Sequence, residues 1–444
     1  MRPTRCRRRR LGGEHVTASA RYKLDSSTQR HGTVVIGGSP LKLFRLTAAG
    51  GSLVQRVSDG DEVPSSTLID SLLNAGAIHP LPSTTPFTID DVTIVVPARG
   101  EPEHRPAGAI IVDDGSVPPI EDATIRLDVN QGPAAARNIG LTLVTTSLVA
   151  FVDADVELPD GWLEPLLAHF SDDQVALVAP RVMTTTSGSM IARYEHRRSP
   201  LDLGPEPARI RAGTRVSYVP AATLVCRVDA ISSIGGFDAG LRFGEDVDLV
   251  WRLDAAGWRC RYEPKSVVHH APRATWSGWI RQRIGYGSSA APLATRHRGA
   301  LAPVRMSPWS VASWFLTMTR RPWLGTVTGV GSTAALIKKL PDVPPQVAFR
   351  LAGLGNLHAG DQLANAVRRV WWPLLAIAAL RSRIARRVLV GAAISARHPV
   401  RLADDVAYSI GVWRGMASER SIAPLVPEFS SWPGRAQRRP EAAR

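Results

Sequence analysis

Cysteine is scarce in this 444-residue sequence, which contains only Cys6, Cys226 and Cys260. A disulfide-stapled domain needs paired cysteines, and a structural zinc site needs Cys or His ligands at short, regular spacings. No such spacing occurs here, so the sequence excludes both classes. A few unpaired cysteines are typical of proteins from a reducing compartment, and we expect a cytoplasmic location.

Long apolar runs are absent as well. In the C-terminal third the longest uncharged run is Pro322 to Ile337, with 16 residues, whereas a spanning helix needs about 20. Residues 1–10 carry six arginines and no apolar stretch follows them, which excludes a secretory signal. We expect residues 1–20 to be a disordered basic extension or to precede the true start. A nucleic-acid-binding arm is the alternative that this pattern leaves open.

Acidic residues are few in the C-terminal third. Residues 273–444 contain 25 Lys and Arg but only 7 Asp and Glu, so the formal charge of +15 is concentrated there. A DNA-binding protein would more often spread basic residues over its folded recognition domain, and we expect no nucleic-acid partner. A basic and apolar tail fits an anionic membrane surface or an acidic partner.

Residues 21–85 are expected to form a compact module. Arg21–Leu24 and Thr33–Gly38 predict a pair of strands. Residues 67–76 predict a helix that ends at Gly76, and a Pro/Thr-rich linker follows at residues 80–86. One further helix is predicted from the spacing of five apolar residues, which are Leu43, Leu46, Leu53, Val54 and Val57.

Residues 91–300 alternate short apolar strands with helical segments. This pattern is typical of an α/β domain with a mostly parallel, Rossmann-like sheet and helices on both faces. Strands are predicted at residues 92–97, 109–114 and 148–153, and each ends at a carboxylate or a loop. Ligands of open α/β sheets bind beyond the carboxyl ends of the strands, so polar residues at these ends are candidate site residues.

Residues 301–425 form a helical pattern rich in Trp and Arg, and we expect residues 426–444 to be a disordered tail. The apolar stretch that opens at Trp371-Trp372 is followed by four arginines between Arg381 and Arg387. Aromatic residues beside arginines suit helices that lie in a membrane interface, which would place the protein at the inner face of the cell membrane. A soluble helical cap on the preceding domain fits the same pattern.

Two strand ends carry candidate nucleotide-binding residues. In Asp113-Asp114-Gly115-Ser116, a carboxylate can accept hydrogen bonds from the uracil N3–H and from ribose hydroxyls, although Asp-Gly is also a common turn. Between Asn130 and Gly140, small residues allow close backbone approach, and Arg137 is placed to meet a nucleotide base or phosphate. An ordinary helix start with Arg137 in solvent is the alternative.

The segment Asp153-Ala154-Asp155 follows the third strand directly. Two acids separated by one residue lie on the same side of an extended chain, and their repulsion is relieved by a cation. Mg²⁺ and Mn²⁺ prefer oxygen ligands and share their coordination shell with substrate phosphates. The pattern therefore predicts a divalent-cation site that stabilises charge on a leaving diphosphate.

A second acidic segment, Gly244-Glu245-Asp246, opens a predicted helix. Acids at this place often only complement the helix dipole. The functional interpretation makes Asp246 the general base that deprotonates an acceptor hydroxyl. Farther along, His269 or His270 follows an apolar run and could complete the metal shell, although a lone histidine is more often structural. We take His269 as the candidate ligand.

In this order, the motifs resemble those of the family 2 glycosyltransferases over residues 92–290. The resemblance implies a GT-A fold and a single displacement that transfers a sugar from a nucleotide-sugar with inversion. It implies roles for Asp114 at the base and ribose, Asp155 at the metal, and Asp246, with Glu245 beside it, in catalysis. The expected nucleotide-sugar-binding residues are Pro97, Ala98, Arg99, Asp113, Asp114, Arg137, Asp153 and Ala154.

The N-terminal module resembles the winged-helix-like PqqD-type domain, which binds a ribosomally made precursor peptide. The resemblance lies in Tyr22–Leu24, Leu43–Thr47 and Leu72–Pro80. Together with the transferase and the basic tail, it resembles glycosyltransferases of the mycofactocin system. This implies transfer of β-linked glucose from UDP-glucose to the peptide-derived redox cofactor. The alternatives are a cell-envelope enzyme with a lipid-linked acceptor, and a degenerate transferase that only binds a peptide.

The sequence departs from the family pattern in two places. Only 11 residues separate Pro97 from Ala109, and a parallel crossover needs a dozen or more. We therefore expect the first helix of the fold to be missing or reduced, and the strands between Val92 and Val112 to be less stable. The segment Trp279–Tyr286 matches only loosely the Gln-x-x-Arg-Trp element of processive relatives, so we expect short oligomers rather than a long polymer.

Overall fold

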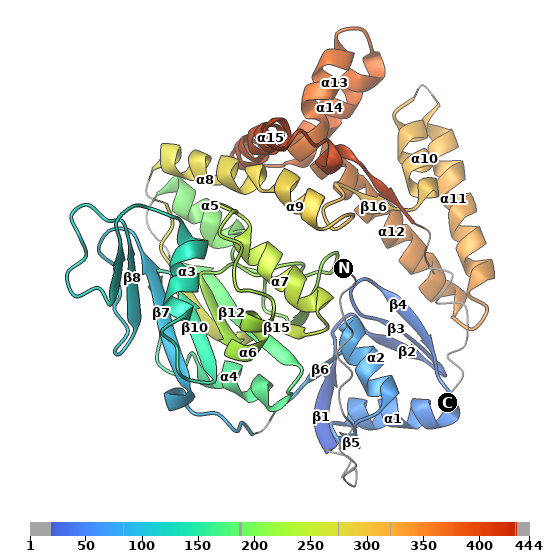
Figure 1. Cartoon of the computed structure of the whole chain (residues 1–444). Coiled ribbons are helices and arrows are strands. Elements are labelled where there is room, and N and C mark those ends of the chain that lie inside the picture. The colour runs from blue at the N-terminus through green and yellow to red at the C-terminus, as the bar shows by residue number, and fades with distance from the viewer. Residues whose placement is uncertain are drawn as a thin grey trace, which may run out of the picture.

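The computed structural model describes residues 19–82, 84–185, 189–273, 275–319, 321–430 and 432. An N-terminal module, a central sheet with its helices and a C-terminal helical region follow one another along the chain (Figure 1). The predicted extension, residues 1–20, lies outside the described residues except for Ser19 and Ala20, which begin the first strand. The predicted tail, residues 426–444, is described only at residues 426–430 and 432, and part of it forms a strand.

The N-terminal module contains two three-stranded antiparallel sheets, ordered β5-β1-β6 and β2-β3-β4. Both segments predicted as strands are strands, but they are the centres of different sheets and do not pair with each other. Apolar side chains of β1 and β3 meet those of both helices in one core. The elements are β1 (Ser19–Leu24), β2 (Gln29–His31), β3 (Val34–Gly37), β4 (Lys42–Arg45), α1 (Ala48–Asp59), β5 (Glu62–Pro64), α2 (Thr67–Ala75) and β6 (Ile78–Pro80).

Helix α1 begins later than the apolar spacing predicts. The Thr47 hydroxyl accepts a hydrogen bond from the Gly50 amide and caps the helix, so Leu43 falls on β4 and Leu46 precedes the cap. The apolar residues of a strand and of the helix that follows it can together show the spacing of one longer helix. The prediction for α2 is confirmed, since Gly76 adopts φ of 70° at its C-terminal end.

The central sheet has nine strands, with eight in the order β11-β15-β12-β14-β10-β7-β8-β9 and β13 paired to β15. The three predicted strands are confirmed as β7, β8 and β10. Strands β10, β7, β8 and β9 are parallel, whereas β14 runs antiparallel between β10 and β12, so the sheet is mixed. The strands are β7 (Val92–Ala98), β8 (Ile110–Asp114), β9 (Ile125–Leu127), β10 (Leu148–Val152), β11 (Val156–Glu157), β12 (Val175–Thr184), β13 (Ala208–Ile210), β14 (Thr223–Arg227) and β15 (Arg259–His270).

Strand β10 shows why helices must cover both faces of the sheet. All five of its residues are buried; Val149 and Phe151 join one apolar cluster, and Leu148 and Ala150 join another. Because successive side chains point to opposite faces, each face needs its own cover. The covering helices (Figure 1) are α3 (Pro133–Leu141), α4 (Glu164–Leu167), α6 (Val228–Ser233) and α7 (Glu245–Ala255). Helix α5 (Met190–Arg198) packs its buried Ile191 and Tyr194 against Trp279 and Val400 of the C-terminal region.

No helix lies in the first crossover, between β7 and β8, as the sequence predicts. Instead, residues 99–109 form a loop that is held at two points. The Gly100 amide donates to the Ser116 hydroxyl at 2.8 Å, and the Glu103 amide donates to the Ala154 carbonyl at 2.9 Å. The loop is therefore tied to the ends of β8 and β10.

The C-terminal region contacts both preceding parts. Helix α15 packs closely on α8, since a Cβ on Gly411 would lie 2.0 Å from the Ile284 carbonyl. Residues of β3 and β4 pack against Leu340 and Val343. Within the described ranges, no helix is both long and apolar enough to cross a membrane. The elements are α8 (Trp276–Ser288), α9 (Ala290–Arg296), β16 (Arg305–Met306), α10 (Pro308–Thr317), α11 (Pro322–Lys339), α12 (Pro345–Ala366), a π-helical turn (Val367–Trp371), α13 (Trp372–Ala379), α14 (Arg383–Ser395), α15 (Pro399–Glu419) and β17 (Glu428–Phe429).

Candidate active site

A cleft of about 1220 Å³ lies beyond the carboxyl ends of β7 and β10, between the start of α7 and the C-terminal helices. Parallel strands direct their carboxyl ends to one edge of the sheet, which explains why motifs far apart in sequence meet here. Of the predicted site residues, Ala98, Asp113, Asp114 and His269 do not line the cleft. Those that line it are Pro97, Arg99, Arg137, Asp153, Ala154, Asp155, Glu245 and Asp246.

Asp155 faces His270 across the pairing of β11 with β15. The distance from His270 Nε2 to Asp155 Oδ2 is 3.4 Å, and Arg273 Nη1 lies 3.7 Å from the same oxygen. Burial would raise the pKa of Asp155, but the hydrogen bond and charge of His270 lower it. His269, the candidate taken from the sequence, does not line the cleft, whereas His270 does, because consecutive residues of a strand point to opposite faces.

These two residues suit a divalent cation that completes its shell with substrate oxygens. Among the described residues, no group of three or more His, Cys, Asp or Glu side chains is arranged to hold a metal. Asp155 and His270 would supply one carboxylate and one imidazole. Mg²⁺ in phosphate-transfer sites is commonly held by one or two protein carboxylates plus phosphate and water, and imidazole also suits transition metals. The pair fits such an ion.

Arg137 joins the two acidic motifs and has almost no exposed surface. Its Nη1 donates to Glu245 Oε1 at 2.9 Å and its Nη2 donates to Asp153 Oδ1 at 2.6 Å. Burial opposes the charged guanidinium, but the charges of Asp153 and Glu245 more than offset this and raise the pKa of Arg137. The structure therefore places Arg137 on two carboxylates, where the sequence suggested a nucleotide base or phosphate.

Asp246 lies at the first turn of α7 and lines the cleft. Its Oδ2 accepts a hydrogen bond from the Ala221 amide at 3.2 Å, and its Oδ1 accepts one from Val247 at 2.8 Å. Burial and the adjacent charge of Glu245 raise the pKa of Asp246 well above its usual range. A carboxylate with a raised pKa accepts protons more readily, as a general base requires. Glu245, in contrast, is occupied by Arg137.

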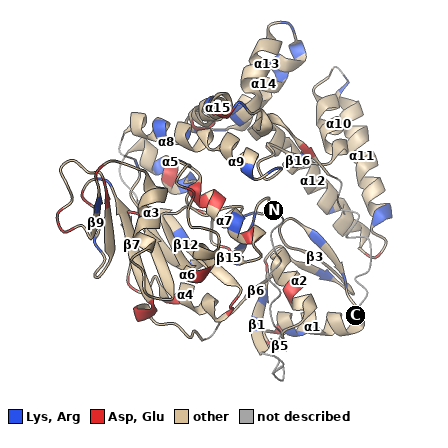
Figure 2. Ribbon diagram, viewed as in Figure 1, with Lys and Arg blue, Asp and Glu red and all other residues tan. Residues whose placement is uncertain are grey.

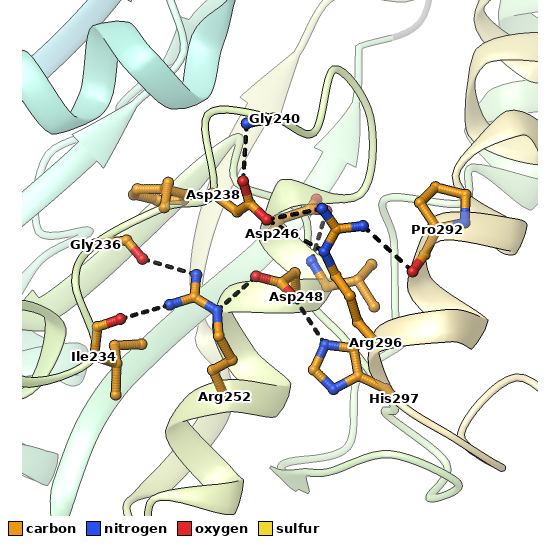
Figure 3. Close-up of polar contacts among 12 residues, drawn as sticks. Ile234, Gly236, Asp238, Gly240, Asp246, Asp248, Arg252, Pro292, Arg296 and His297 are labelled. Carbon is orange, nitrogen blue, oxygen red and sulfur yellow. Dashed lines mark hydrogen bonds and ion pairs between the residues drawn. The ribbon is translucent and has the colours of Figure 1, made fainter. Parts of the chain in front are cut away.

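Polar contacts behind Asp246 fix the position of α7 (Figure 3). Asp248 accepts from Arg252 Nε at 2.6 Å and lies 2.8 Å from His297 Nε2, which follows α9. Arg252 also donates to two carbonyls of the loop before α7, and Asp238 in that loop pairs with Arg296 of α9. Figure 2 shows the corresponding contrast between acidic α7 and basic α9. Helix α7 is therefore fixed by contacts with the loop that precedes it and with the end of α9.

Asp113 and Asp114 shape the loops beside the cleft. Asp113 is completely buried and accepts from the Ser116 amide at 2.8 Å, the Ile120 amide at 3.1 Å and the Arg126 guanidinium. Asp114 accepts from the side chain of Asn130 and from the amides of Gln131 and Gly132. Both carboxylates therefore already accept several hydrogen bonds within the protein, and neither lines the cleft.

Two parts of the cleft wall were not found by sequence reasoning. One is the crossover loop, with Gly100, Glu101 and Glu103 beside the predicted Arg99. The other comes from the C-terminal region, where the guanidinium carbon of Arg369 lies 3.8 Å from the centre of the Tyr408 ring. No strand-end motif marks these residues, and only the aromatic and basic character of residues 273–444 hints at them. Further wall residues are Tyr286, Gln362, Asn365, Arg401 and Asp405.

Comparisons with known proteins agree with this geometry. Residues 104–230 match the model of the family "Glycosyl transferase family 2". The pre-mycofactocin glycosyltransferase of Mycobacterium tuberculosis is 38% identical over an alignment 454 positions long, which covers 90% of this chain and 95% of that protein. The succinoglycan biosynthesis protein ExoA of Rhizobium meliloti is 24% identical, over 59% of this chain and 91% of that protein.

Among solved structures, the chain is similar to a mannosyltransferase from Pyrobaculum calidifontis in complex with GDP-Man and Mn²⁺. The alignment covers 77% of this chain and 90% of that chain. Its TM-score is 0.42 and its sequence identity is 15%.

The mixed sheet, the cleft at the strand ends and the family match define a glycosyltransferase with a GT-A fold. More narrowly, the chain belongs to family 2 of the glycosyltransferases, in the same family as the pre-mycofactocin glycosyltransferase with which it shares nearly its whole length.

Proposed function

We propose that this enzyme transfers glucose from UDP-glucose, with inversion, to the peptide-derived redox cofactor mycofactocin and extends it to a short oligosaccharide. The observation that carries the proposal is that Asp246 lines the same cleft as Asp155 and His270. The residue proposed as the base and the residues proposed as metal ligands therefore line one cavity. The similarity to the pre-mycofactocin enzyme over 90% of the chain supports the choice of acceptor.

In the proposed mechanism, an acceptor hydroxyl enters from the side of the C-terminal helices. Asp246 takes the proton of this hydroxyl. The oxygen of the acceptor hydroxyl then bonds to the anomeric carbon of the donor sugar. The bond from that carbon to the phosphate oxygen breaks, and the nucleoside diphosphate leaves with the electron pair. Arg137 holds Asp153 and Glu245 in place, and Tyr218 and Tyr286 flank the cleft.

We propose Asp155 and His270 as the protein ligands of Mg²⁺ or Mn²⁺. When bound, the cation would neutralise charge that develops on the leaving diphosphate. Arg273, 3.7 Å from Asp155, would lie beside the same phosphates.

The decisive test is a transfer assay with UDP-glucose, Mn²⁺ or Mg²⁺ and a mycofactocin precursor. Asp246→Asn and Asp155→Asn should each abolish most transfer while the circular dichroism spectrum stays unchanged. The matched control is Glu157→Gln, an exposed acid two residues beyond Asp155, which should keep full activity. Full transfer by Asp155→Asn would refute the assignment, and transfer only to a lipid-linked acceptor would favour the cell-envelope alternative.

We propose that the N-terminal module binds the precursor peptide in the manner of PqqD-type domains. Its two small sheets and its own apolar core support an independent binding unit. Four apolar residues of this module, Val34, Ile36, Leu41 and Leu43, also pack against the C-terminal region. The full-length chain should bind a fluorescent precursor peptide, and a DNA duplex should not compete for it.

We further propose peripheral attachment to the inner face of the cell membrane. The hairpin α13–α14 projects from the top of the molecule in Figure 1, and α10–α11 lies along its upper right side. Each exposes large apolar side chains, and basic residues lie near the helix ends. The exposed apolar residues include Trp309, Phe315, Trp323, Ile377 and Leu380, and the basic ones include Lys338, Lys339, Arg381, Arg383 and Arg387.

Vesicle flotation tests this attachment. The enzyme should float with phosphatidylglycerol vesicles and much less with phosphatidylcholine vesicles. The double change Ile377→Asp with Leu380→Asp should reduce flotation. Ile89→Asp is the matched control, because Ile89 is 61% exposed but lies before the catalytic sheet, in another part of the chain. Equal loss in the control, or no binding to either vesicle, would refute the proposal.

A further inference from the structure

A second cavity, of about 210 Å³, lies where the N-terminal module meets the central sheet. The module contributes Lys23 and the segment His79–Pro82, and the catalytic part contributes residues around β13 and β15. None of its lining residues lines the donor cleft. The proposed reaction therefore leaves this cavity without a role.

Arg261 of β15 lines this cavity and is only 3% exposed. In the part of the chain that the structure describes, its side chain has no hydrogen bond or ion pair, and its Nε is buried without a partner. Burial lowers the pKa of Arg261 to about 10. A buried and unpaired guanidinium is costly, because it has lost water without gaining a counter-charge.

Other arginines at the same junction are paired. Arg259 Nη2 lies 2.7 Å from Asp70 of the module, and Arg209 lies 2.8 Å from Asp254. Arg215 Nη2 lies 3.4 Å from Asp25. Arg261 thus differs from its neighbours in facing a cavity where they face a carboxylate.

The rest of the cavity lining is also short of free acceptors. Glu263 is its one carboxylate among the described residues, and it already accepts from His169 and from the Lys265 amide. Because His169 donates through Nε2 to Glu263, its buried and unpartnered Nδ1 is an acceptor and adds no further donor. Lys23 and Lys265 add two ammonium groups. The cavity therefore presents three cationic groups, Arg261 and the two lysines, and little negative charge to balance them.

We propose that this cavity is a binding site for a small oxyanion, a phosphate or a carboxylate, held by Arg261 and the two lysines. The planar fork of a guanidinium matches both groups with paired hydrogen bonds. The volume is below the roughly 300 Å³ at which pockets for drug-sized ligands begin, so a whole nucleotide is too large. The oxyanion is either free phosphate or the carboxylate of an acidic residue.

Occupancy of the site would join two parts of the molecule. Lys23 belongs to β1 of the module, whereas Arg261 belongs to β15, whose last residue is His270 of the donor cleft. An oxyanion bound between these two cations replaces their mutual repulsion by two attractive contacts. Its binding therefore stabilises the docking of the module on the catalytic sheet.

The test uses the full-length protein in phosphate-free buffer, titrated calorimetrically with sodium phosphate or sodium acetate at constant ionic strength. Wild-type protein should bind and show a raised melting temperature. Arg261→Met should weaken binding by about tenfold or more, because charged hydrogen bonds are lost, and it should remain folded because methionine fills similar space without a charge. The matched control is Arg259→Gln, at the same junction but outside the cavity, which should keep wild-type affinity.

The anions distinguish the two sources. Arg261-dependent binding of phosphate alone identifies free phosphate, and equal binding of acetate identifies an acidic residue. Phosphate held in the donor cleft would be unaffected by Arg261→Met, so only the Arg261-dependent part counts. Equal affinity in wild type and Arg261→Met, or no binding of either anion at millimolar concentration, would overturn the proposal.

Discussion

His270 Nε2 lies 3.4 Å from Asp155 Oδ2, across the antiparallel pairing of β11 with β15. The neighbouring His269 pairs with Glu157 in the same ladder, and its side chain points to the other face. The two histidines therefore form a natural pair of test and control, in which sequence context is matched and only the direction of the side chain differs.

The first prediction concerns this pair. His270→Ala should raise the Mn²⁺ concentration needed for half-maximal transfer by about tenfold or more, since one protein ligand is lost. His269→Ala should leave it unchanged. Metal titrations of transfer activity, together with Mn²⁺ binding followed by electron paramagnetic resonance, provide the measurement. A larger effect of His269→Ala would restore the assignment made from the sequence.

The second prediction concerns the pH dependence of Asp246. A general base must be deprotonated, and burial together with Glu245 raises the pKa of this carboxyl. The value of kcat/KM should therefore fall on the acid side with a midpoint well above the value of about 4 of an ordinary aspartate. A midpoint at the ordinary value would contradict the role of Asp246.

The same shift predicts an effect on stability. A group whose folded-state pKa exceeds its unfolded value contributes stability below the unfolded pKa, and loses it as the pH rises through the folded pKa. Asp246→Asn should therefore raise the free energy of unfolding relative to wild type at pH 8, and much less at pH 5, while transfer is lost. Denaturant unfolding at both pH values measures this, and an equal effect at the two would count against it.

The sequence predicted most of the fold because its signals are local. Strands β7, β8 and β10 are continuous apolar runs, and Gly76 ends α2 through its own backbone conformation. The module was predicted less well. Leu43 and Leu46 show helical spacing, yet Thr47 begins the helix after them, and nothing local specifies which strand pairs with which.

For the site too, local features could be predicted and tertiary contacts could not. Its acidic motifs could be located because each follows a strand, but their partners are set by tertiary structure. Arg137 and Glu245 are 108 positions apart in sequence, and no local pattern distinguishes an arginine that meets a carboxylate from one that meets a phosphate. Similarly, the wall formed by Arg369 and Tyr408 depends on how α15 packs on the π-helical turn at residues 367–371.

A further prediction concerns the buried bridge made by Arg137. Arg137→Met leaves Asp153 and Glu245 close together without a counter-charge, and should lower the free energy of unfolding by about 3–5 kcal/mol. Adding Glu245→Gln should recover part of this loss, because one uncompensated charge is removed. Urea unfolding of the single and double variants measures both effects. Arg181→Met, which breaks a more exposed pair with Asp202, should cost less and serves as the control.

The last prediction concerns the first crossover, where a loop replaces a helix. The apolar cluster that includes Val96, Ala98 and Ile111 has one further buried member, Ile120, whereas β10 is covered by large clusters on both faces. Local opening costs less where fewer apolar contacts must break. Amides of β8, and to a lesser degree β7, should therefore exchange hydrogen faster than those of Val149 and Val152, as measured by mass spectrometry of peptides from each strand. Equal protection of β8 and β10 would show that the loop, through its bonds to Ser116 and Ala154, secures this edge of the sheet as well as a helix does.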